Sequence, residues 1–394
     1  MEHYEILGLD LEVREGGLMG RLTGELGAEV EPFWSFFLTA INKNRVLATQ
    51  GESNVYSLFL PPLPSKAGVR ELKRKLLRRF FKRTIPCSLT FAVTYRCQAD
   101  CIHCSSAHHR SEDRAELSTE ECLKVIDQAI ELGVITVILS GGEPLLRPDV
   151  FEIIAHVDKE RAICNLFTNG HLLTEERVQH LKEAGLHSAL VSLDSPDPQT
   201  HNTWRRVPGI FERAIEGLER AKRAGLLVGI STYITKEGLA RGDHERMMAL
   251  GKEIGVHEIV FFDTLPSGRF RDNRQELLDR QEKEQILAFT QKYLHAPGYP
   301  GIITQAWINN PKGSGCFAGN EQMYITAYGD VCPCDFTPLS FGNLRQTSLQ
   351  QVWNRMISHE EYGQKRGDCR LQDPEFQRKY LDPIPRDVPL PFPV

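Results

Sequence analysis

The sequence lacks any apolar run that could cross a membrane. Near the start, the longest apolar and aromatic stretch is PFWSFFLTAI, far shorter than the roughly 20 residues that a transmembrane helix needs. The opening MEHYEILGLDLEVREGG is acidic and has no long apolar core, so it does not look like a secretory signal peptide. We therefore expect a cytoplasmic protein whose ten cysteines stay reduced rather than form disulfides.

A strong excess of one charge is also missing. The formal net charge of the 394 residues is only −5, and 25% of them are charged, so the composition is that of an ordinary globular protein. This balance does not favour nucleic acid as a partner. The length suits one large domain with appendages, or two to three domains.

Residues 1–64 lack a long apolar period and end in the proline-rich LFLPPLPS, which we interpret as a linker or turn. In the next stretch, KAGVRELKRKLLRRFFKR, apolar residues recur at helical spacing while Lys and Arg fill the other face. This pattern predicts an amphipathic helix over residues 66–83. Its basic face either lies in solvent while the helix packs on the following domain, or contacts an acidic partner, a leader peptide or a membrane surface.

From residue 87 to about residue 264, six short apolar strands alternate with helices, beginning with CSLTFAVT and ending with VHEIVFFDT. One of these helices, over residues 118–133, starts with a capping box formed by Ser118 and Glu121 and closes at Gly133. The alternation predicts parallel strands with right-handed crossovers, hence an α/β sheet or partial barrel. Chemistry in such folds lies at the carboxyl ends of the strands, where the polar motifs of this sequence fall.

Three cysteines follow the first of these strands, in TYRCQADCIHCSS. Cys97, Cys101 and Cys104 have the spacing C-x3-C-x2-C, with no fourth cysteine nearby. A zinc site wants four close ligands, and only neighbouring histidines could complete it. Iron–sulfur clusters are held by cysteine thiolates, and a 4Fe–4S cluster with three of them leaves one iron open for chemistry.

The cysteine spacing after the first strand, together with SGGEP at residues 140–144, resembles the radical S-adenosylmethionine (SAM) superfamily over about residues 87–265. This resemblance implies a partial (β/α)6 TIM-like barrel in which Cys97, Cys101 and Cys104 hold a 4Fe–4S cluster that binds SAM. In such enzymes one electron splits SAM, and the resulting 5′-deoxyadenosyl radical removes a hydrogen atom from the substrate. The residues that the resemblance places around SAM are His103, Gly141, Gly142, Glu143, Asn169, Ser192, Asp194 and one of Arg205 or Arg206, with His201 nearby.

Four cysteines lie late in the chain, in a glycine-rich region that contains GCFAG, YGDVCPCDF and FGNL. This punctuation resembles the SPASM/twitch type of C-terminal domain, which implies one auxiliary 4Fe–4S cluster. Its candidate ligands are Cys316, Cys332, Cys334 and Cys369, and the identity of the fourth ligand stays open. A zinc knot or buried thiols are the alternatives. The scattered Cys87, Cys122 and Cys164 are interpreted as small buried hydrophobes.

We expect an N-terminal extension over residues 1–84, a radical SAM core over 85–270 and an auxiliary-cluster domain with a proline-rich tail over 271–394. The predicted function is a radical SAM enzyme that modifies a peptide. The alternative is the same chemistry on a small molecule, a tetrapyrrole or a lipid precursor, and a non-enzymatic iron–sulfur or zinc module is a third hypothesis. A flavodoxin or ferredoxin is the expected electron donor. Candidate catalytic residues, chosen because they could face the cavity, are Cys332, Asp263, Tyr324 and Asp335.

Overall fold

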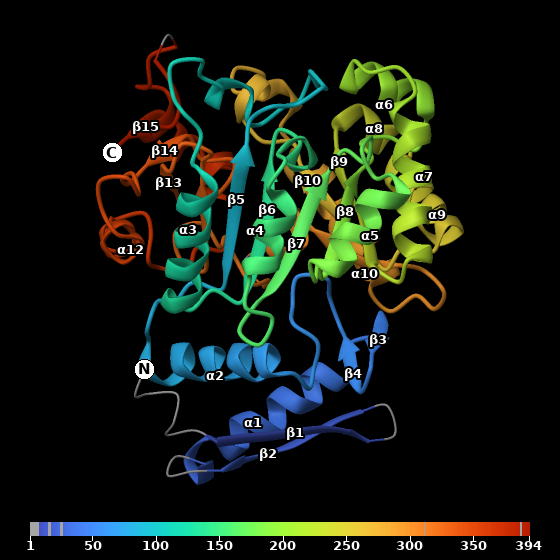
Figure 1. Ribbon diagram of the computed structural model, residues 1–394, viewed down its shortest axis with the longest axis vertical. Helices are drawn as coiled ribbons and strands as arrows, with labels where there is room; N and C mark the ends of the chain where they lie inside the picture. The colour runs from blue at the N-terminus through green and yellow to red at the C-terminus, as the bar shows by residue number, and fades with distance from the viewer. Residues whose placement is uncertain (1–7, 15–16, 24–26, 311, 387) are drawn as a thin grey trace.

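The computed structural model describes residues 8–14, 17–23, 27–310, 312–386 and 388–394 and is built around one nine-stranded sheet (Figure 1). Six neighbouring strands are parallel and follow one another in sequence order, which confirms the predicted α/β alternation. They are β5 (Ser88–Thr94), β6 (Thr136–Gly141), β7 (Ile163–Thr168), β8 (Ser188–Ser192), β9 (Leu227–Ile234) and β10 (Glu258–Asp263).

A single layer of helices covers the outer face of these strands (Figure 1). Within this layer, each helix contacts the next one along the chain. The layer comprises α3 (Thr119–Leu132), α4 (Val150–His156), α5 (Glu175–Glu183), α7 (Ile210–Arg223) and α9 (Asp243–Ile254). Both halves of the capping box between Ser118 and Glu121 are present at the start of α3. Apolar residues of these helices and of the strands form one large core between the two layers.

Strands from the last third of the chain extend the sheet at both edges. On one side β11 (Gly301–Thr304) pairs in parallel with β10, and on the other β12 (Gln322–Ile325) pairs in parallel with β5. β13 (Val331–Cys332) then pairs with β12 in antiparallel fashion. The division at residue 270 stays a prediction, but strands from both sides of it share one sheet. The barrel-like core and the late cysteine region are therefore joined by backbone hydrogen bonds.

The remaining elements are shorter or peripheral. Helices α6 (Pro198–Arg205), α8 (Lys236–Ala240), α10 (Arg280–Leu294) and α11 (Gln305–Ile308) complete the core, and α12 (Leu349–Ile357), α13 (Pro374–Phe376), β14 (Leu339–Ser340) and β15 (Phe392–Pro393) belong to the C-terminal region. Among the residues described, we find no helix with the length and hydropathy needed to span a bilayer.

The described residues of the N-terminal segment form more helices and strands than the sequence indicated. It contains a hairpin of β1 (Gly8–Arg14) and β2 (Gly17–Thr23), the helix α1 (Gly27–Asn42) and a second hairpin of β3 (Ala48–Gln50) and β4 (Ser53–Val55). The helical period of α1 is hard to recognise in the sequence, because large apolar residues lie on opposite sides of this helix. Trp34 is fully buried and donates to the Gly20 carbonyl at 3.0 Å, whereas Phe36 is 72% exposed.

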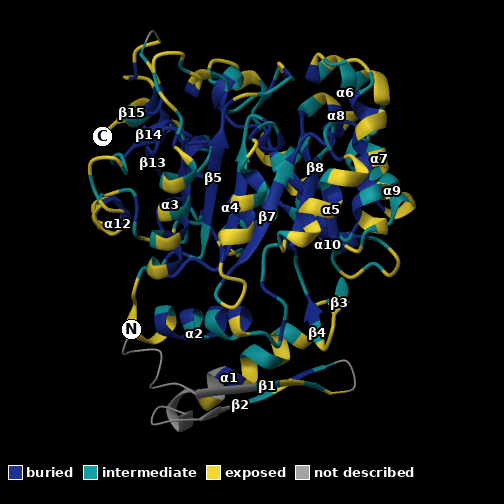
Figure 2. Cartoon of the chain, in the orientation of Figure 1, coloured by how far each residue is buried: buried dark blue, intermediate teal, exposed yellow. Residues whose placement is uncertain are grey.

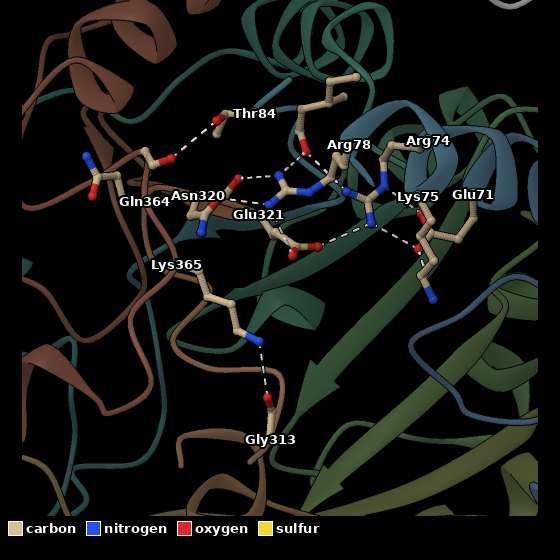
Figure 3. Close-up of polar contacts among 12 residues, drawn as sticks. Glu71, Arg74, Lys75, Arg78, Thr84, Gly313, Asn320, Glu321, Gln364 and Lys365 are labelled. Carbon is tan, nitrogen blue, oxygen red and sulfur yellow. Dashed lines mark hydrogen bonds and ion pairs between the residues drawn. The ribbon is translucent and has the colours of Figure 1, made fainter. Parts of the chain in front are cut away.

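Helix α2 (Lys66–Phe81) confirms the predicted amphipathic helix and lies across the amino-terminal ends of the strands (Figures 1 and 2). Ser65 caps it by accepting a hydrogen bond from the Gly68 amide. However, not all of its cations lie in solvent. Arg74 is buried and ion-paired with Glu71, and Arg78 donates to Asn320, so these two cations bind the protein itself (Figure 3).

Candidate functional site

A cavity of about 860 Å³ lies on the inner face of the sheet, and two separate groups of cysteine thiols line it. The first group follows the carboxyl end of β5, and the second belongs to the C-terminal region. Each group contains three cysteines, namely Cys97, Cys101 and Cys104 in the first and Cys316, Cys334 and Cys369 in the second. All six are free thiols.

The loop after β5 holds the first three thiols close to one another without joining them. The Cys97 sulfur accepts a hydrogen bond from the Ala99 amide at 3.4 Å, and the Cys104 sulfur lies 3.5 Å from the Ser106 hydroxyl. Burial raises the pKa of Cys101 to about 11, and the other two thiols add to the effect. Within the described part of the chain, no three Cys, His, Asp or Glu side chains converge around a single ion.

Gly141 and Gly142 allow the turn after β6 to contact the start of the cysteine loop. The Gly142 amide donates to the Thr94 carbonyl at 2.8 Å. A Cβ at Gly141 would lie 2.1 Å from that carbonyl oxygen, and the φ of Gly141 is +129°. A Cβ at Gly142 would lie 2.3 Å from the Arg96 carbonyl. Only glycine fits this approach, and both glycines line the cavity.

Glu143, the residue after these glycines, links the turn to the end of β7. It is fully buried, and it accepts hydrogen bonds from the Thr168 hydroxyl at 2.9 Å and the Asn169 amide at 2.8 Å. Burial raises the pKa of Glu143. The resemblance to the radical SAM superfamily implies that Glu143 lies beside SAM, but Glu143 is not among the residues that line the cavity. Glu143 thus contacts the backbone of Asn169, and Asn169 does line the cavity.

Asp194, directly after β8, forms a buried ion pair with Arg205 of α6. Arg205 donates from Nε to Oδ2 at 2.6 Å and from Nη2 to Oδ1 at 3.0 Å, and His103 Nε2 lies 3.3 Å from Oδ2. Burial would raise the pKa of Asp194, but Arg205 and His103 outweigh it and hold this pKa well below its usual value. By contrast, Arg206 pairs with Asp100 at the surface. Arg205 is thus the arginine of this pair that reaches the cavity.

The other predicted SAM-site residues gather around this pair. His103 and Ser192 line the cavity, and Ser192 accepts a hydrogen bond from the Ser231 hydroxyl at 3.2 Å. His201 does not line it, because its Nδ1 accepts from the Asp194 amide at 3.0 Å inside the wall. Burial lowers the pKa of His201 to about 4, consistent with a neutral acceptor.

The second group of thiols includes three of the four late cysteines. Burial raises the pKa of Cys334 to about 12 and also raises that of Cys369, with further contributions from neighbouring thiols. Cys332 is different. Although it is only two residues from Cys334, it lies in β13 opposite Tyr324 and is buried among aromatic residues away from the cavity. The expectation that Cys332 faces the cavity is wrong.

The glycine and asparagine residues of the late motifs YGDV and FGNL have structural roles. Gly329, with φ of +87°, turns the chain between β12 and β13. Asn343 of the GN pair donates to the Tyr328 carbonyl and to Asp330 Oδ1, both at 2.9 Å. Asp330 in turn accepts a hydrogen bond from the Thr326 hydroxyl at 3.0 Å. These contacts fix the hairpin that leads into Cys334.

Of the remaining catalytic candidates, two line the cavity and one does not. Tyr324 and Asp335 line the cavity, whereas Asp263 does not. The Tyr324 hydroxyl lies 2.7 Å from the Tyr95 hydroxyl, and Asp335 accepts from Gln322 at 3.2 Å. Burial raises the pKa of Asp335 to about 6. Asp263 instead accepts from Gln372 at 3.3 Å beneath the wall.

Sequence reasoning missed several residues that line the middle of the cavity. Tyr233 of β9 packs against His103 with ring centroids 4.9 Å apart, and Phe262 of β10 packs against Phe336 at 5.9 Å. Gln322 of β12 also lines this part. Ser231 and Tyr233 of β9 lie two residues apart and therefore point to the same face of the sheet.

The thiol groups and the surrounding polar atoms fit an iron–sulfur cluster and SAM. Three thiolates can hold a 4Fe–4S cluster with one open iron. Beside them, His103 Nδ1 is buried and has no hydrogen-bond partner among the described residues, which leaves it available to a bound molecule. The fold and the site thus define an α/β-barrel enzyme class with a cysteine-ligated cluster at the carboxyl ends of its strands.

Comparison with known families agrees with this class. Residues 91–251 match the radical SAM superfamily, and residues 316–374 match an iron–sulfur cluster-binding domain known as SPASM. An AdoMet-dependent heme synthase from Methanosarcina barkeri is 30% identical over 73% of this chain and 89% of its own length. The chain belongs to the radical SAM superfamily. It uses SAM and a 4Fe–4S cluster and carries an auxiliary iron–sulfur cluster domain.

Other relatives differ in what they act on. A PqqA peptide cyclase from Gluconobacter oxydans is 27% identical over 68% of this chain and 76% of its own length. Among solved structures, Streptococcus suis SuiB bound to precursor peptide SuiA covers 88% of this chain and 87% of its own, with a TM-score of 0.59 and 16% identity. Native anSMEcpe with bound AdoMet covers 69% and 82%, with a TM-score of 0.53 and 18% identity. These two likenesses concern the fold.

Proposed function

We propose that this radical SAM enzyme removes a hydrogen atom from a peptide substrate held in the cavity between the two thiol groups. The observation that carries the proposal is that both groups line one cavity. The similarity to PqqA peptide cyclases supports a peptide. When bound, the reduced cluster and SAM supply a 5′-deoxyadenosyl radical, which is the oxidant for an unactivated carbon.

Different residues of this chain bind the two clusters, SAM and the substrate. Cys97, Cys101 and Cys104 hold the first cluster, and Cys316, Cys334 and Cys369 hold the auxiliary one. The backbone of Gly141 and Gly142, with Asn169, Ser192, His103 and the Asp194–Arg205 pair, forms the SAM site. The aromatic wall of Tyr233, Phe262 and Phe336 excludes water and orients the substrate. A flavodoxin or ferredoxin supplies the electron.

A second candidate substrate is a tetrapyrrole. It is favoured by the similarity to AdoMet-dependent heme synthases, which is 28–30% identical over 71–73% of this chain in three relatives. The chemistry of hydrogen abstraction would be the same, and the two substrates differ in how the cavity must recognise them.

The deciding experiment is an anaerobic iron and sulfide count with electron paramagnetic resonance, together with an assay for 5′-deoxyadenosine. We expect about four irons to remain in a Cys97/Cys101/Cys104→Ala variant, one cubane's worth, and no 5′-deoxyadenosine. A wild-type protein that never cleaves SAM under reducing conditions would refute the proposal. Mass change in a co-encoded peptide, or in a carboxylated tetrapyrrole, then assigns the substrate.

A further inference from the structure

The end of the cavity beside α2 carries an excess of positive charge. Six charged side chains line it, and these are four cations of α2 (Arg74, Lys75, Arg78 and Arg79) and two carboxylates (Glu71 and Glu321). At the opposite end, Asp194 accepts two hydrogen bonds from Arg205. The surplus of cations is therefore local to the α2 end.

The two carboxylates are committed to two of the four cations. Arg74 donates from Nε and Nη2 to Glu71, at 2.6 and 3.0 Å, and Nη2 also reaches Glu321 at 3.2 Å. Arg78 lies 3.3 Å from Glu321 and donates to the Asn320 carbonyl at 3.0 Å (Figure 3). Since Glu321 immediately precedes β12, this network anchors α2 to the sheet.

Lys75 and Arg79 are the two cations of α2 that the two carboxylates neutralise least. Among the residues that the structure describes, Lys75 pairs with one carboxylate, Glu71 at 3.5 Å, which Arg74 also occupies. Its ammonium lies 5.5 Å from the centre of the Phe37 ring, which also lines the cavity. Arg79 is exposed and forms no hydrogen bond or ion pair with the residues that the structure describes. Four residues apart on one helix, Lys75 and Arg79 share a face.

We propose that Lys75 and Arg79 bind a carboxylate of the substrate at this end of the cavity. The inference rests on the proposed function, because it needs a substrate in the same cavity. A guanidinium can bind a carboxylate through two parallel hydrogen bonds, and an ammonium adds a point charge beside it. The anchoring of α2 by Arg74 and Arg78 holds both cations in place before binding, which lowers the entropic cost.

The position of this subsite also constrains the length of the substrate. α2 lies at the amino-terminal end of β5, where Arg74 donates to the Ile85 carbonyl at 3.1 Å, whereas Cys97 follows the carboxyl end of β5. β5 spans seven residues, or roughly 20 Å. A substrate that reaches both ends must be extended, with its carboxylate remote from the reacting carbon. An acidic peptide and a carboxylated tetrapyrrole both meet this requirement.

The test measures binding to the full-length holoenzyme with SAM under anaerobic conditions. The probes are a fluorescent porphyrin with four carboxylates and a dye-labelled peptide with three consecutive glutamates, each paired with its methyl ester or glutamine counterpart. Lys75→Gln and Arg79→Gln are compared with Lys82→Gln, an exposed lysine just beyond α2 that does not line the cavity. Arg79→Lys keeps the charge and controls for folding.

We expect a carboxylate probe to bind more tightly than its neutral counterpart. Glutamine at position 75 or 79 should raise its dissociation constant roughly tenfold, while Lys82→Gln stays within about threefold of the wild type. Arg79→Lys should fall between these limits, because lysine keeps the charge but not the paired hydrogen bonds. Preference for the porphyrin or for the peptide identifies the source of the carboxylate, and either supports the inference. Equal binding of charged and neutral probes, no binding, or unchanged affinity in both glutamine variants overturns it. Formation of 5′-deoxyadenosine by the wild type separates this failure from failure of the proposed function.

Discussion

Arg205 donates two hydrogen bonds to Asp194, at 2.6 and 3.0 Å, and thereby joins α6 to the end of β8 in the cavity wall. His103 of the cysteine loop lies 3.3 Å from the same carboxylate. One buried ion pair therefore links the cluster loop, a strand end and a helix. Removing one partner of such a pair leaves the other charge buried and uncompensated.

Asp194→Asn should lower the free energy of unfolding by about 3–5 kcal/mol, because Arg205 would lose its counter-charge. SAM binding should weaken as well, since the wall that carries His103 shifts. Asp100→Asn is the matched control, because Asp100 pairs with Arg206 and Arg269 at the surface. Anaerobic urea unfolding and calorimetric SAM titration measure both effects. Equal unfolding midpoints for the wild type and Asp194→Asn would show that the pair is dispensable.

Gly141→Ala should disrupt the site through the backbone alone. The added Cβ would lie 2.1 Å from the Thr94 carbonyl at a φ of +129°, so the turn must move away from the cysteine loop. Gly209→Ala is the control, because Gly209 has a φ of +73° but a Cβ added there would meet no other atom within 4 Å.

We expect Gly209→Ala to cost only about 1–2 kcal/mol from the left-handed conformation. Gly141→Ala should cost more and should weaken SAM binding at least about tenfold, because a shift of the turn misplaces the wall that both glycines line. Thermal unfolding and SAM titration report these two quantities separately. Near-equal effects of the two substitutions on SAM binding would argue against the close-approach explanation.

The auxiliary cluster should depend on Cys334 but not on Cys332. Cys334→Ala removes a thiol that lines the cavity, and Cys332→Ala removes one buried in the aromatic cluster. In the background of Cys97/Cys101/Cys104→Ala, we expect the Cys334 variant to lose most of the remaining iron. The Cys332 variant should retain about four irons per chain. Loss of iron in the Cys332 variant would restore Cys332 to the ligand set.

Glu258 should make stability depend on pH. It is buried at the start of β10, where its Oε2 accepts from the Leu58 amide at 2.9 Å, and burial raises its pKa to about 7. Between its ordinary pKa of 4.5 and about 7, the unfolded chain has lost this proton while the folded protein keeps it. Stability is therefore lost as the pH rises through this window.

The measurement compares Glu258→Gln with the wild type at pH 5.5 and pH 7.5. The variant cannot ionise, so the wild type should lose about 2 kcal/mol of unfolding free energy relative to it between these two values. Glu253→Gln, on the exposed surface of α9, controls for the loss of a carboxylate. A constant difference between Glu258→Gln and wild type over this range contradicts the prediction.

Much of the fold could be predicted because its signals are local. The first and last of the six core strands were expected within a few residues of their observed bounds, since buried parallel strands are short continuous apolar runs between turn residues. The capping box at Ser118 and Glu121 is likewise a local pattern. α1 could not be predicted, because Trp34 and Phe36 place large apolar groups on different sides of the helix and obscure its period.

The candidate site could be predicted in part. Motif spacing brought Cys97, Cys101 and Cys104 to one loop, and it indicated Gly141 and Gly142. It could not show that Glu143 links the turn to the end of β7 or that Arg205 is paired with Asp194, because both facts depend on neighbours distant in sequence.

The order of residues along the chain was enough to establish the strand–helix alternation, the cysteine spacing and the glycines of the close turn, since each depends on residues a few positions apart. Which cysteines share the cavity emerged only on folding. Cys332 and Cys334 are separated by one residue, but pairing of β13 with β12 buries the first among aromatic rings and leaves the second at the cavity wall. Folding likewise anchors Arg74 and Arg78 of α2, while Lys75 shares Glu71 with Arg74 and Arg79 lies exposed. The reason is that burial and charge compensation arise between segments hundreds of residues apart, such as Arg74 and Glu321, and no local pattern records them.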